Sequence, residues 1–432
     1  MTDEIKRRLE QTKNGVVPEG YNCEKGKIIP STWSSKKLGD VLQKIGKRVA
    51  VEKDVYYTQI GIRSHGKGLF YKEPVSGAEL GNKAVFWIEK DCFVVNIVFA
   101  WEQAIGKTTE NEVGMIGSHR FPMYRAIRSQ ASIDYLLWFF STKRGVDVLQ
   151  AASPGGAGRN KTLGQKEFAN SKVVFPPFSE QEKIAEILNH CEKVIKLKDE
   201  LITEEYKQKR WLMQNLFNPD SGVRLYGFDG EWKNFKLSKN GATYGGLMGK
   251  SAEDFGKGKP YIPYMNIFAN HIIKDDRYDY VAIYENDKQN KVNYGDILFT
   301  TSSETPEEVG MSAVYLGSEE ELYLNSFSFG YRLTNFNDLL PEFAAYLFNC
   351  QHIKRLMYKL AQGATRYNLS KTELMKQSVI IPPTIDEQTA IVNILSTTDR
   401  KIGLLIQELD QWKQKKKVLM QFLLTGIVRV SV

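Results

Sequence analysis

Two glycine-rich loops carry lysines at a spacing typical of loops that bind nucleotide phosphates. Residues 61–68 have the right spacing from glycine to lysine, but Gly68 stands where a serine or threonine would bind magnesium. Residues 245–251 end in Lys250 and Ser251, but this loop is one residue too short. Neither loop clearly lies between an apolar strand and a helix, as a nucleotide site requires. We therefore interpret both as flexible loops suited to face the phosphates of DNA.

The other reactive side chains predict no catalytic or metal site. Five histidines and four cysteines are scattered, and none has the spacing of metal ligands. Ser118 and His119 are adjacent, but sequence neighbours rarely share the geometry of a nucleophile and its base. Residues 176–178 read Pro-Pro-Phe, as in adenine methyltransferases, but Phe175 stands where that motif needs Asn or Asp. We predict no catalytic residue, no metal and no cofactor in this chain.

Basic, polar and aromatic side chains form a pattern suited to DNA contact. Arg and Lys bind phosphates and guanine edges, and Asn pairs with adenine. A solvated surface explains any single member equally well, so the prediction rests on the set. The candidates in the first half of the chain are Arg63, Lys67, Tyr71, Lys72, Ser118, His119, Arg120, Tyr124, Arg125, Arg159 and Asn160. The candidates in the second half are Lys250, Ser251, Tyr264, Asn266, Thr301, Ser302, Asn325, Arg366, Tyr367 and Asn368.

The net charge of +8 is concentrated at the N-terminal end of the chain. Residues 1–178 contain 27 Lys and Arg against 18 Asp and Glu, a balance of +9. The balance is −1 for residues 179–217, −2 for residues 218–385 and +2 for residues 386–432. A polyanionic partner therefore fits the first block by charge alone, and the second block less well.

Length and composition predict an ordinary globular protein. The chain has 432 residues, of which 42% are hydrophobic and 25% charged, enough for roughly two to three domains. Its longest apolar stretch, residues 92–101, is about half of what a membrane-spanning helix needs. The charged residues 1–10 lead into no apolar signal segment. We expect a cytoplasmic protein that does not contact membranes.

An internal duplication organises the chain with an offset of 207 residues. The dipeptide Glu-Gln at residues 180–181 recurs at 387–388. Each copy follows a paired proline, at residues 176–177 and 382–383, and each proline pair follows a short apolar run. Such a run predicts a strand that is stopped by proline. The sequence therefore indicates a duplicated half-protein, in which a variable block precedes each repeated segment.

Both repeated segments fit one heptad register. The predicted seam consists of Ile184, Leu188, Ile195, Ile202, Leu212, Leu216, Ile391, Leu395, Ile402, Leu405, Leu409, Trp412, Leu419 and Leu423. Each segment can form a helix of about 36 to 40 residues, roughly 55 to 60 Å long, and Ser179 with Glu182 predicts a capping box. We predict two antiparallel helices related by an approximate two-fold axis. Packing of each helix on its own block is the alternative, and the shared register favours the pair.

The blocks before the repeated segments mix strand and helix patterns. Strands are predicted at residues 84–88, 93–99, 296–300, 311–316 and 327–333, and helices at residues 133–144 and 341–360. We predict an α/β protein with two globular domains joined by two long antiparallel coiled-coil helices in a pseudo-two-fold duplication. The predicted parts are an N-terminal segment (1–30), a first domain (31–178), a central helix (179–217), a second domain (218–384), and a C-terminal helix and tail (385–432).

Together these features strongly resemble the specificity (S) subunit of type I restriction-modification enzymes, over nearly the whole chain. The residues that carry the resemblance are Phe175-Pro176-Pro177, Glu180-Gln181, Ile381-Pro382-Pro383, Glu387-Gln388, the Gly-Ala-x-Arg loops at 156–159 and 363–366, Trp33 and Trp232. The resemblance implies that each block is a target recognition domain. Each domain would bind one half of a bipartite, asymmetric site in double-stranded DNA, with the coiled coil as a ruler for the gap.

The resemblance also implies a non-catalytic subunit with catalytic partners. Two modification (M) subunits would bind S-adenosylmethionine and methylate adenine, and two restriction (R) subunits of the full complex would use ATP and magnesium. A coiled-coil scaffold is one alternative, and it would bind protein partners without sequence-dependent DNA affinity. A fused restriction-methylation enzyme is another alternative, which the missing methyltransferase motifs disfavour.

Overall fold

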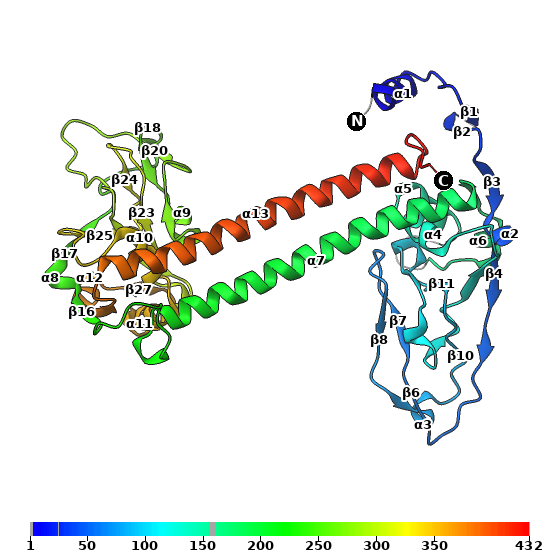
Figure 1. The fold of residues 1–432 in the computed structure, drawn as a ribbon, viewed down its shortest axis with the longest axis horizontal. Coiled ribbons are helices and arrows are strands. Elements are labelled where there is room, and N and C mark those ends of the chain that lie inside the picture. The colour runs from blue at the N-terminus through cyan, green and yellow to red at the C-terminus, as the bar shows by residue number, and fades with distance from the viewer. Residues whose placement is uncertain (1–2, 25, 156–160, 432) are drawn as a thin grey trace. The chain divides into compact units, whose positions relative to one another are not determined.

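The computed structural model describes residues 3–24, 26–155 and 161–431. The chain forms two compact units: unit 1 is Met1–Lys198 with Glu408–Val432, and unit 2 is Asp199–Gln407 (Figure 1). Both boundaries run through long helices, so each unit holds one variable block and part of both helices. The finer domain limits inferred from the sequence stay predictions.

Unit 1 is built from short strands and short helices. Its strands are Tyr21–Glu24 (β1), Lys27–Pro30 (β2), Ser34–Lys37 (β3), Leu42–Ile45 (β4), Lys47–Arg48 (β5), Tyr56–Tyr57 (β6), Ile60–Ile62 (β7), Leu69–Tyr71 (β8), Val75–Ser76 (β9), Val85–Trp87 (β10), Cys92–Val95 (β11), Ile105–Lys107 (β12), Ile116–Ser118 (β13), Met123–Ala126 (β14) and Lys172–Phe175 (β15). Its helices are Asp3–Lys13 (α1), Leu38–Val41 (α2), Gly77–Leu80 (α3), Ile133–Phe140 (α4), Lys143–Ala151 (α5) and Gln165–Asn170 (α6), with 3-10 turns at Ala100–Glu102 (η1) and Glu110–Glu112 (η2).

The largest sheet of unit 1 is antiparallel and has the strand order β12-β11-β14-β4. A second sheet has the order β13-β10-β5. Every residue of β11 is buried, and Phe93 from this strand packs against Phe140 and Phe168, which come from α4 and α6. Aromatic packing therefore fixes the helices of unit 1 against its main sheet.

Unit 2 has a larger, mixed sheet. Its strands are Lys233–Lys236 (β16), Gly241–Gly245 (β17), Phe255–Ile262 (β18), Ile272–Ile273 (β19), Asp279–Val281 (β20), Ile297–Thr300 (β21), Ser302–Ser303 (β22), Ser312–Tyr315 (β23), Tyr323–Leu324 (β24), Ser328–Leu333 (β25), Ala361–Gln362 (β26), Tyr367–Leu369 (β27) and Ser378–Ile381 (β28). Its helices are Leu237–Asn240 (α8), Tyr264–Ala269 (α9), Pro341–Leu347 (α10), Gln351–Leu360 (α11) and Lys371–Met375 (α12), with 3-10 turns at Pro219–Ser221 (η3), Ala252–Asp254 (η4) and Pro306–Glu308 (η5).

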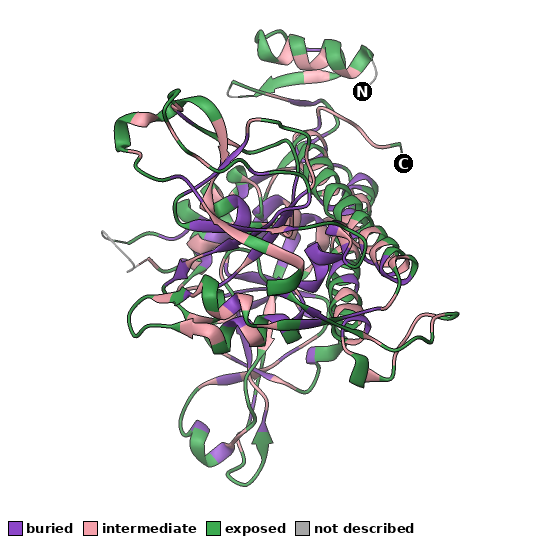
Figure 2. Cartoon of the chain, turned by 90° about the vertical axis from the view of Figure 1, so that its left-hand side faces the viewer, coloured by how far each residue is buried: buried purple, intermediate pink, exposed green. Residues whose placement is uncertain are grey.

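The main sheet of unit 2 has the order β17-β25-β21-β23-β19, in which only the β19–β23 pair is parallel. The central strand β21 is buried along its whole length, as expected for a strand covered on both faces. Figure 2 shows the buried residues gathered inside this unit and the exposed residues on its loops. A smaller sheet has the order β22-β27-β26, and its strand β22 begins two residues after β21 ends.

The two long helices are Phe178–Leu216 (α7) and Ile385–Leu423 (α13), each of 39 residues. In unit 1, Lys198 pairs with Glu408 and Glu192 pairs with Lys416. In unit 2, Glu205 pairs with Lys401 and Lys209 pairs with Asp399. Within each unit, moving forward along α7 therefore means moving back along α13. The antiparallel pairing predicted from the sequence is confirmed.

None of the predicted seam residues is fully exposed. Buried ones are Ile184, Leu188, Ile202, Leu216, Ile391, Leu395, Ile402, Leu409 and Leu423, and partly buried ones are Ile195, Leu212, Leu405, Trp412 and Leu419. The ends of the seam also join the cores of the blocks, since Ile184 and Leu423 lie in the core of unit 1 and Leu216 and Ile391 in that of unit 2. Both packing modes considered from the sequence thus occur, at different places along the helices.

Each block is connected to its long helix in the same way. Strand β15 pairs with β3, ends at Phe175 and is followed by two prolines before α7 begins. Strand β28 pairs with β16 and leads through the second proline pair into α13. The prediction of a strand stopped by prolines is confirmed. Ser179 was expected to cap α7, and this is wrong because the helix already begins at Phe178.

The repeated glutamines attach each block to its helix. In unit 1 the side chain of Gln181 accepts a hydrogen bond from the Ser132 amide at the start of α4 (2.9 Å) and donates to the Gln130 carbonyl (3.2 Å). In unit 2, Gln388 accepts from the Leu340 amide at the start of α10 (2.9 Å) and donates to the Asp338 carbonyl (2.7 Å). Each buried side-chain amide thus both accepts a hydrogen bond from the block and donates one to it. These bonds hold the block against the start of its helix.

The repeated glutamates are buried charges, each held by an arginine. Glu180 is 2% exposed and receives two hydrogen bonds from Arg429 (2.7 and 2.8 Å) and one from the indole of Trp33 (3.1 Å). Glu387 is 1% exposed and receives two from Arg224 (both 2.8 Å). We call these groups the Glu180 joint and the Glu387 joint. They explain why Glu-Gln recurs in the sequence.

The sequence predicted the type of most other elements but not their breaks. The strand predictions overlap β10, β11, β21, β23 and β25. The helix predicted at residues 133–144 ends at Phe140 as α4, and α5 begins only at Lys143. The helix predicted at residues 341–360 is divided into α10 and α11. The described helices include none long and apolar enough to cross a membrane.

Candidate nucleic-acid interface

The first glycine-rich loop is the turn of a β-hairpin. Strands β7 and β8 pair antiparallel around it, and His65, Gly66 and Gly68 adopt left-handed backbone conformations in the turn. Gly61 is needed because a Cβ there would lie 2.2 Å from the ring of Phe70. A strand-turn-strand unit has no helix N-terminus to hold phosphates. The loop therefore lacks the strand-loop-helix arrangement of a nucleotide-binding loop.

This hairpin brings four candidate residues together. Arg63, Lys67, Tyr71 and Lys72 are all exposed on it or directly after it. The guanidinium of Arg63 binds the Leu69 carbonyl (3.1 Å) and lies over the ring of Phe70. Tyr71 donates a short hydrogen bond to Glu112, which raises the pKa of Tyr71. Lys67 and Lys72 are thus the members of this group best placed to meet phosphates.

A second loop of unit 1 joins β13 to β14 and carries other candidates. His119 and Arg120 are exposed, and Ser118 is partly buried. Arg125 is exposed but forms an ion pair with Glu89 (2.6 Å). Tyr124 is 5% exposed and belongs to the core of unit 1, where burial raises its pKa to about 12. Alternate residues of a strand face opposite sides, so Tyr124 faces the core while its neighbour Arg125 faces solvent. The predicted DNA contact of Tyr124 does not fit this position.

The same region contains basic residues that sequence analysis missed. Lys44, Lys47 and Arg48 belong to β4 and β5 and are exposed. A cavity of about 420 Å³ is lined by Lys44 and His119 among others. The signal was present, since three basic residues occur within residues 44–48. Strand pairing brings them close to His119, because β4 pairs with β14, and β5 is joined through β10 to β13.

In unit 2 the second glycine-rich loop is engaged in internal contacts. The side chain of Lys250 is 4% exposed and pairs with Asp287. Ser251 binds the carboxylate of Asp254 through both its amide (2.8 Å) and its hydroxyl (3.0 Å), and so begins η4. Lys250 cannot reach a phosphate without breaking a shielded ion pair. The prediction of DNA contact by Lys250 does not fit the structure.

Two asparagines proposed for adenine contact are also internal. Asn266 is 6% exposed and donates to the carbonyls of Asp276 and Arg277. Asn325 is 7% exposed, donates to the Ile262 carbonyl and accepts from the amide of Phe327. Because their amides already hold turns of the backbone, neither can pair with a base edge.

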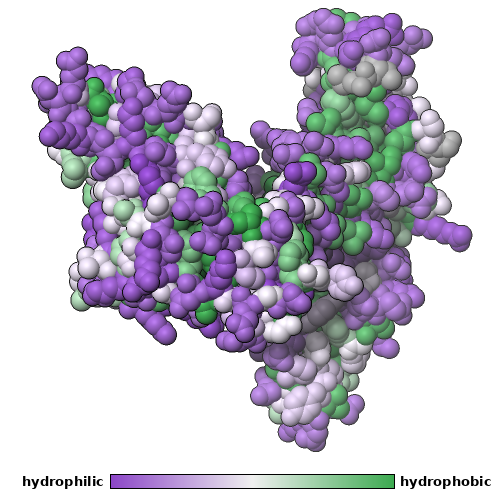
Figure 3. Space-filling model, turned by 60° about the vertical axis from the view of Figure 1, so that its left-hand side comes forward, coloured by the Kyte–Doolittle hydropathy of each residue, from purple (hydrophilic) through white to green (hydrophobic). Residues whose placement is uncertain are grey.

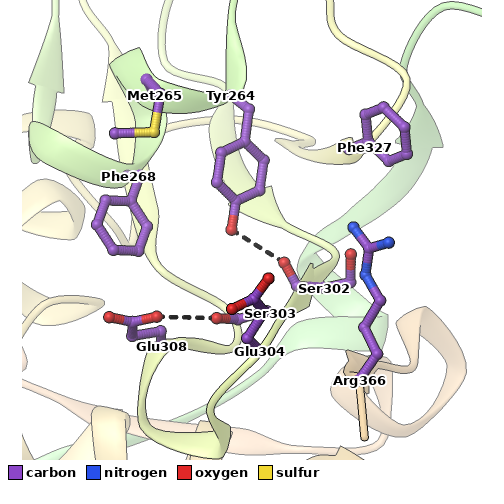
Figure 4. Close-up of a pocket in the computed structure, with 9 residues that line it drawn as sticks. All are labelled: Tyr264, Met265, Phe268, Ser302, Ser303, Glu304, Glu308, Phe327 and Arg366. Atoms are coloured by element: carbon purple, nitrogen blue, oxygen red, sulfur yellow. Dashed lines mark hydrogen bonds between the residues drawn. The ribbon is translucent and has the colours of Figure 1, made fainter.

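Three of the six remaining candidates of unit 2 meet at one cavity of about 330 Å³. Tyr264 from α9, Ser302 from β22 and Arg366 from the loop between β26 and β27 line it together. The Tyr264 hydroxyl donates to the Ser302 carbonyl (2.9 Å), and burial raises the pKa of Tyr264. Figure 4 shows Phe327 and Arg366 on one side of Tyr264, with Met265 and Phe268 on the other. Met265, Phe268 and Phe327 were not among the residues predicted from the sequence.

Strand pairing explains why distant residues meet here. Strand β27 pairs with β22, so Asn368 lies opposite Ser302 and Tyr367 opposite Ser303. Thr301 is partly buried, and its carbonyl accepts from the amide of Leu369 (2.8 Å). Asn368 is exposed and Tyr367 partly buried beside the cavity. Arg159 and Asn160, the corresponding candidates of unit 1, lie outside the described residues.

The surface of unit 2 that faces the viewer in Figure 3 is mostly hydrophilic, broken by small apolar patches. Among the described residues, no group of His, Cys, Asp and Glu could hold a metal ion. For binding, the cavity beside Tyr264 offers the cation of Arg366, the hydroxyls of serines and aromatic rings.

Comparison with known proteins gives one family. Two stretches of the chain, residues 30–205 and 231–414, match the family described as the type I restriction modification DNA specificity domain. The chain is also similar to the specificity subunit of the type I restriction enzyme MjaVIII from Methanocaldococcus jannaschii. These two proteins are 24% identical, over 96% of this chain and 97% of the relative.

Solved structures show a similar fold. The HsdS subunit from Thermoanaerobacter tengcongensis aligns with a TM-score of 0.52 at 16% identity, over 93% of this chain and 98% of that chain. A chain from a study of complex assembly and conformational transition of the type I R-M system aligns with a TM-score of 0.54 at 16% identity, over 93% of this chain and 99% of that chain. At such identities these matches support the fold alone.

Proposed function

We propose a detailed function from the premise that this chain belongs to the family of type I restriction-modification DNA specificity proteins. Members of this family are non-catalytic specificity subunits. Each variable block would bind one half of a bipartite, asymmetric site in double-stranded DNA. The helices α7 and α13 would set the spacer between the half-sites, and the chain would dock methyltransferase subunits.

The observation that carries the proposal is the duplication of the joint between block and helix. Gln181 and Gln388 attach unlike blocks to equivalent points of the two helices. Two rigidly attached but different binding surfaces suit a target whose halves differ in sequence, because sequence is read by the side chains of each surface.

Helix length supports the proposed ruler. A helix of 39 residues is about 58 Å long at 1.5 Å per residue. Half-sites one DNA turn apart are separated by about 34 Å, which leaves room for the bodies of the blocks. Insertion of one heptad into both helices should lengthen the recognised spacer without changing either half-site.

Docking of methyltransferase subunits is supported by apolar residues on the outer faces of the helices. In unit 2, Leu201, Tyr206 and Trp211 of α7 and Leu404 and Ile406 of α13 are exposed. Large apolar side chains exposed in this way indicate a partner surface. Since the subunit is non-catalytic, two M subunits with S-adenosylmethionine would supply methylation. Two R subunits with ATP and magnesium would supply restriction.

The testing experiment is a map of modified adenines across the host genome, with and without this gene. We expect loss of one bipartite motif that is methylated on both strands. An unchanged map, with the M subunits verified as expressed and active, would overturn the proposal and favour a protein-interaction scaffold. Replacement of residues 231–384 by the matching block of a relative should change one half of the motif only.

A further inference from the structure

The cavity of unit 2 has the form of a receptor for a flat ring. Its lining contains Met265 and three aromatic rings, of which Tyr264 and Phe268 are stacked at a centroid distance of 6.1 Å and an interplanar angle of 20°. Phe327 is 59% exposed although it belongs to the lining. A volume of about 330 Å³ lies at the small end for ligand pockets, so it suits one ring system.

Polar groups around these rings match the other parts of a nucleotide. Arg366 lies over the ring of Phe327 at 6.0 Å and is exposed, so it can hold a phosphate beside a stacked base. Glu308 already accepts a hydrogen bond from Ser303 (2.9 Å). Glu304 has no hydrogen-bond or ion-pair partner in the described part of the chain, and its carboxylate can accept from the exocyclic amino group of a base.

The shape of the cavity decides how a base could enter. Ser302 and Ser303 line it and are buried, whereas Phe327, which also lines it, is exposed. A base that stays stacked in a duplex presents only its edge to a protein. A base must leave the stack before aromatic side chains can contact its face.

We propose that this cavity of unit 2 binds one base that is turned out of the duplex within the half-site read by the second block. The inference rests on the proposed function, and it adds a receptor for an extruded base on the specificity subunit itself. A base with an exocyclic amino group fits best, because Glu304 offers an acceptor. Phe327 contacts the face of the base, and Arg366 neutralises its phosphate.

The experiment uses the complex of this chain with its M subunits and duplexes that carry the mapped target. Each nucleotide opposite the second half-site is replaced in turn by an abasic nucleotide, which leaves one unpaired base. Turning out an unpaired base costs less, so at one position we expect binding about 10-fold tighter than to the intact duplex. The methylated adenine, which the M subunit must also turn out, serves as an internal positive control.

Variants then assign the effect to the cavity. Phe327→Ala should reduce the preference at the new position to near unity and leave the preference at the methylated adenine unchanged. Phe327→Trp should retain it, because the aromatic face is kept. Phe336→Ala is the matched control, since Phe336 is also an exposed phenylalanine of unit 2 but does not line this cavity.

Two results would overturn the inference. One is the absence of any preferred position other than the methylated adenine, and the other is a preferred position that Phe327→Ala leaves intact. Both leave sequence-specific binding of the intact duplex unaffected, whereas failure of the proposed function would abolish that binding altogether.

Discussion

The Glu180 joint and the Glu387 joint perform the same task with different parts of the chain. In unit 2 the arginine comes from residues 217–232, the segment that leads from α7 into the second block. In unit 1 it comes from the tail that follows α13. Unit 1 adds a hydrogen bond from Trp33, whereas Trp232 lies beside Arg224 with its ring at 6.0 Å. Duplication therefore preserved the buried carboxylate and let its partners differ.

The DNA-facing candidates of the two units differ more than their joints do. Unit 1 presents exposed lysines on and beside a β-hairpin, and unit 2 presents a cavity lined in part by aromatic rings. This contrast agrees with the charge balance of +9 for residues 1–178 and −2 for residues 218–385. Scaffold positions that do the same work in both halves stay alike, and the proposed binding surfaces differ.

The largest expected effect is that of Arg224→Ala at the Glu387 joint. It leaves Glu387 buried without its partner, which should cost about 3 kcal/mol. Urea unfolding measures the loss, and hydrogen exchange at the start of α13 locates it in unit 2. Arg224→Lys is the matched variant and should recover part of the stability. Equal exchange in Arg224→Ala and the wild type would contradict this account.

Arg429→Ala should have a smaller effect, of about 2 kcal/mol, at the Glu180 joint. Trp33 still donates to Glu180 in this variant, so the carboxylate keeps one partner. Faster hydrogen exchange should be confined to the first turns of α7. The double variant with Trp33→Phe and Arg429→Ala should lose more unfolding free energy than the sum of the losses in the two single variants. A loss equal to that sum would show that the two partners act independently.

Acid sensitivity should distinguish Asp399 of unit 2 from Glu192 of unit 1, which is at the equivalent position of the repeat. Burial opposes ionisation of Asp399, but hydrogen bonds from His271 and Lys209 outweigh it and lower its pKa to about 2. The folded state therefore favours the ionised form, and this stability is present above pH ~4 and is lost as the pH falls toward 2. The stabilisation of the folded state by ionised Asp399 amounts to about 2 kcal/mol.

Unfolding followed between pH 5 and pH 2 tests this difference. Asp399→Asn should reduce the pH dependence of unit 2 in that range without abolishing it, because Asp275 also has its pKa lowered to about 2, by hydrogen bonds from Ser318 and Tyr315 that outweigh its burial. Glu192 forms only a half-exposed ion pair with Lys416, so Glu192→Gln should change stability by about 0.5 kcal/mol or less. Similar pH profiles for both variants would remove the distinction between the two positions.

The smallest expected effects concern single lysines in DNA binding. Lys67→Ala and Lys72→Ala should each weaken binding several-fold and reduce the slope of log affinity against log salt by about 1. Lys166→Ala on α6 is the control and should leave the slope unchanged. Lys250→Ala should lower stability instead of the salt slope, because its partner is Asp287. A slope change for Lys250→Ala alone would reverse the assignment.

Local pattern was enough to predict the scaffold. The heptad spacing and the proline pairs predicted α7 and α13 close to their observed ends. Local sequence pattern failed to predict where backbone hydrogen bonds end a helix that hydrophobicity alone would continue. Ser141, at the end of α4, is such a position. For single site residues the prediction was weaker, because Lys250, Asn266 and Asn325 have the residue types of a binding site but satisfy contacts inside the fold.

The amino-acid sequence by itself determined the duplication, the class of each block and the antiparallel helix pair, because these depend on periodicity and on residue types that recur at a fixed offset. Only the tertiary structure decided which polar residues are free. Burial and hydrogen bonding depend on which strands pair, as β27 does with β22. That pairing placed Arg366 beside Tyr264 and Phe327 at one cavity, although these residues lie far apart in the chain.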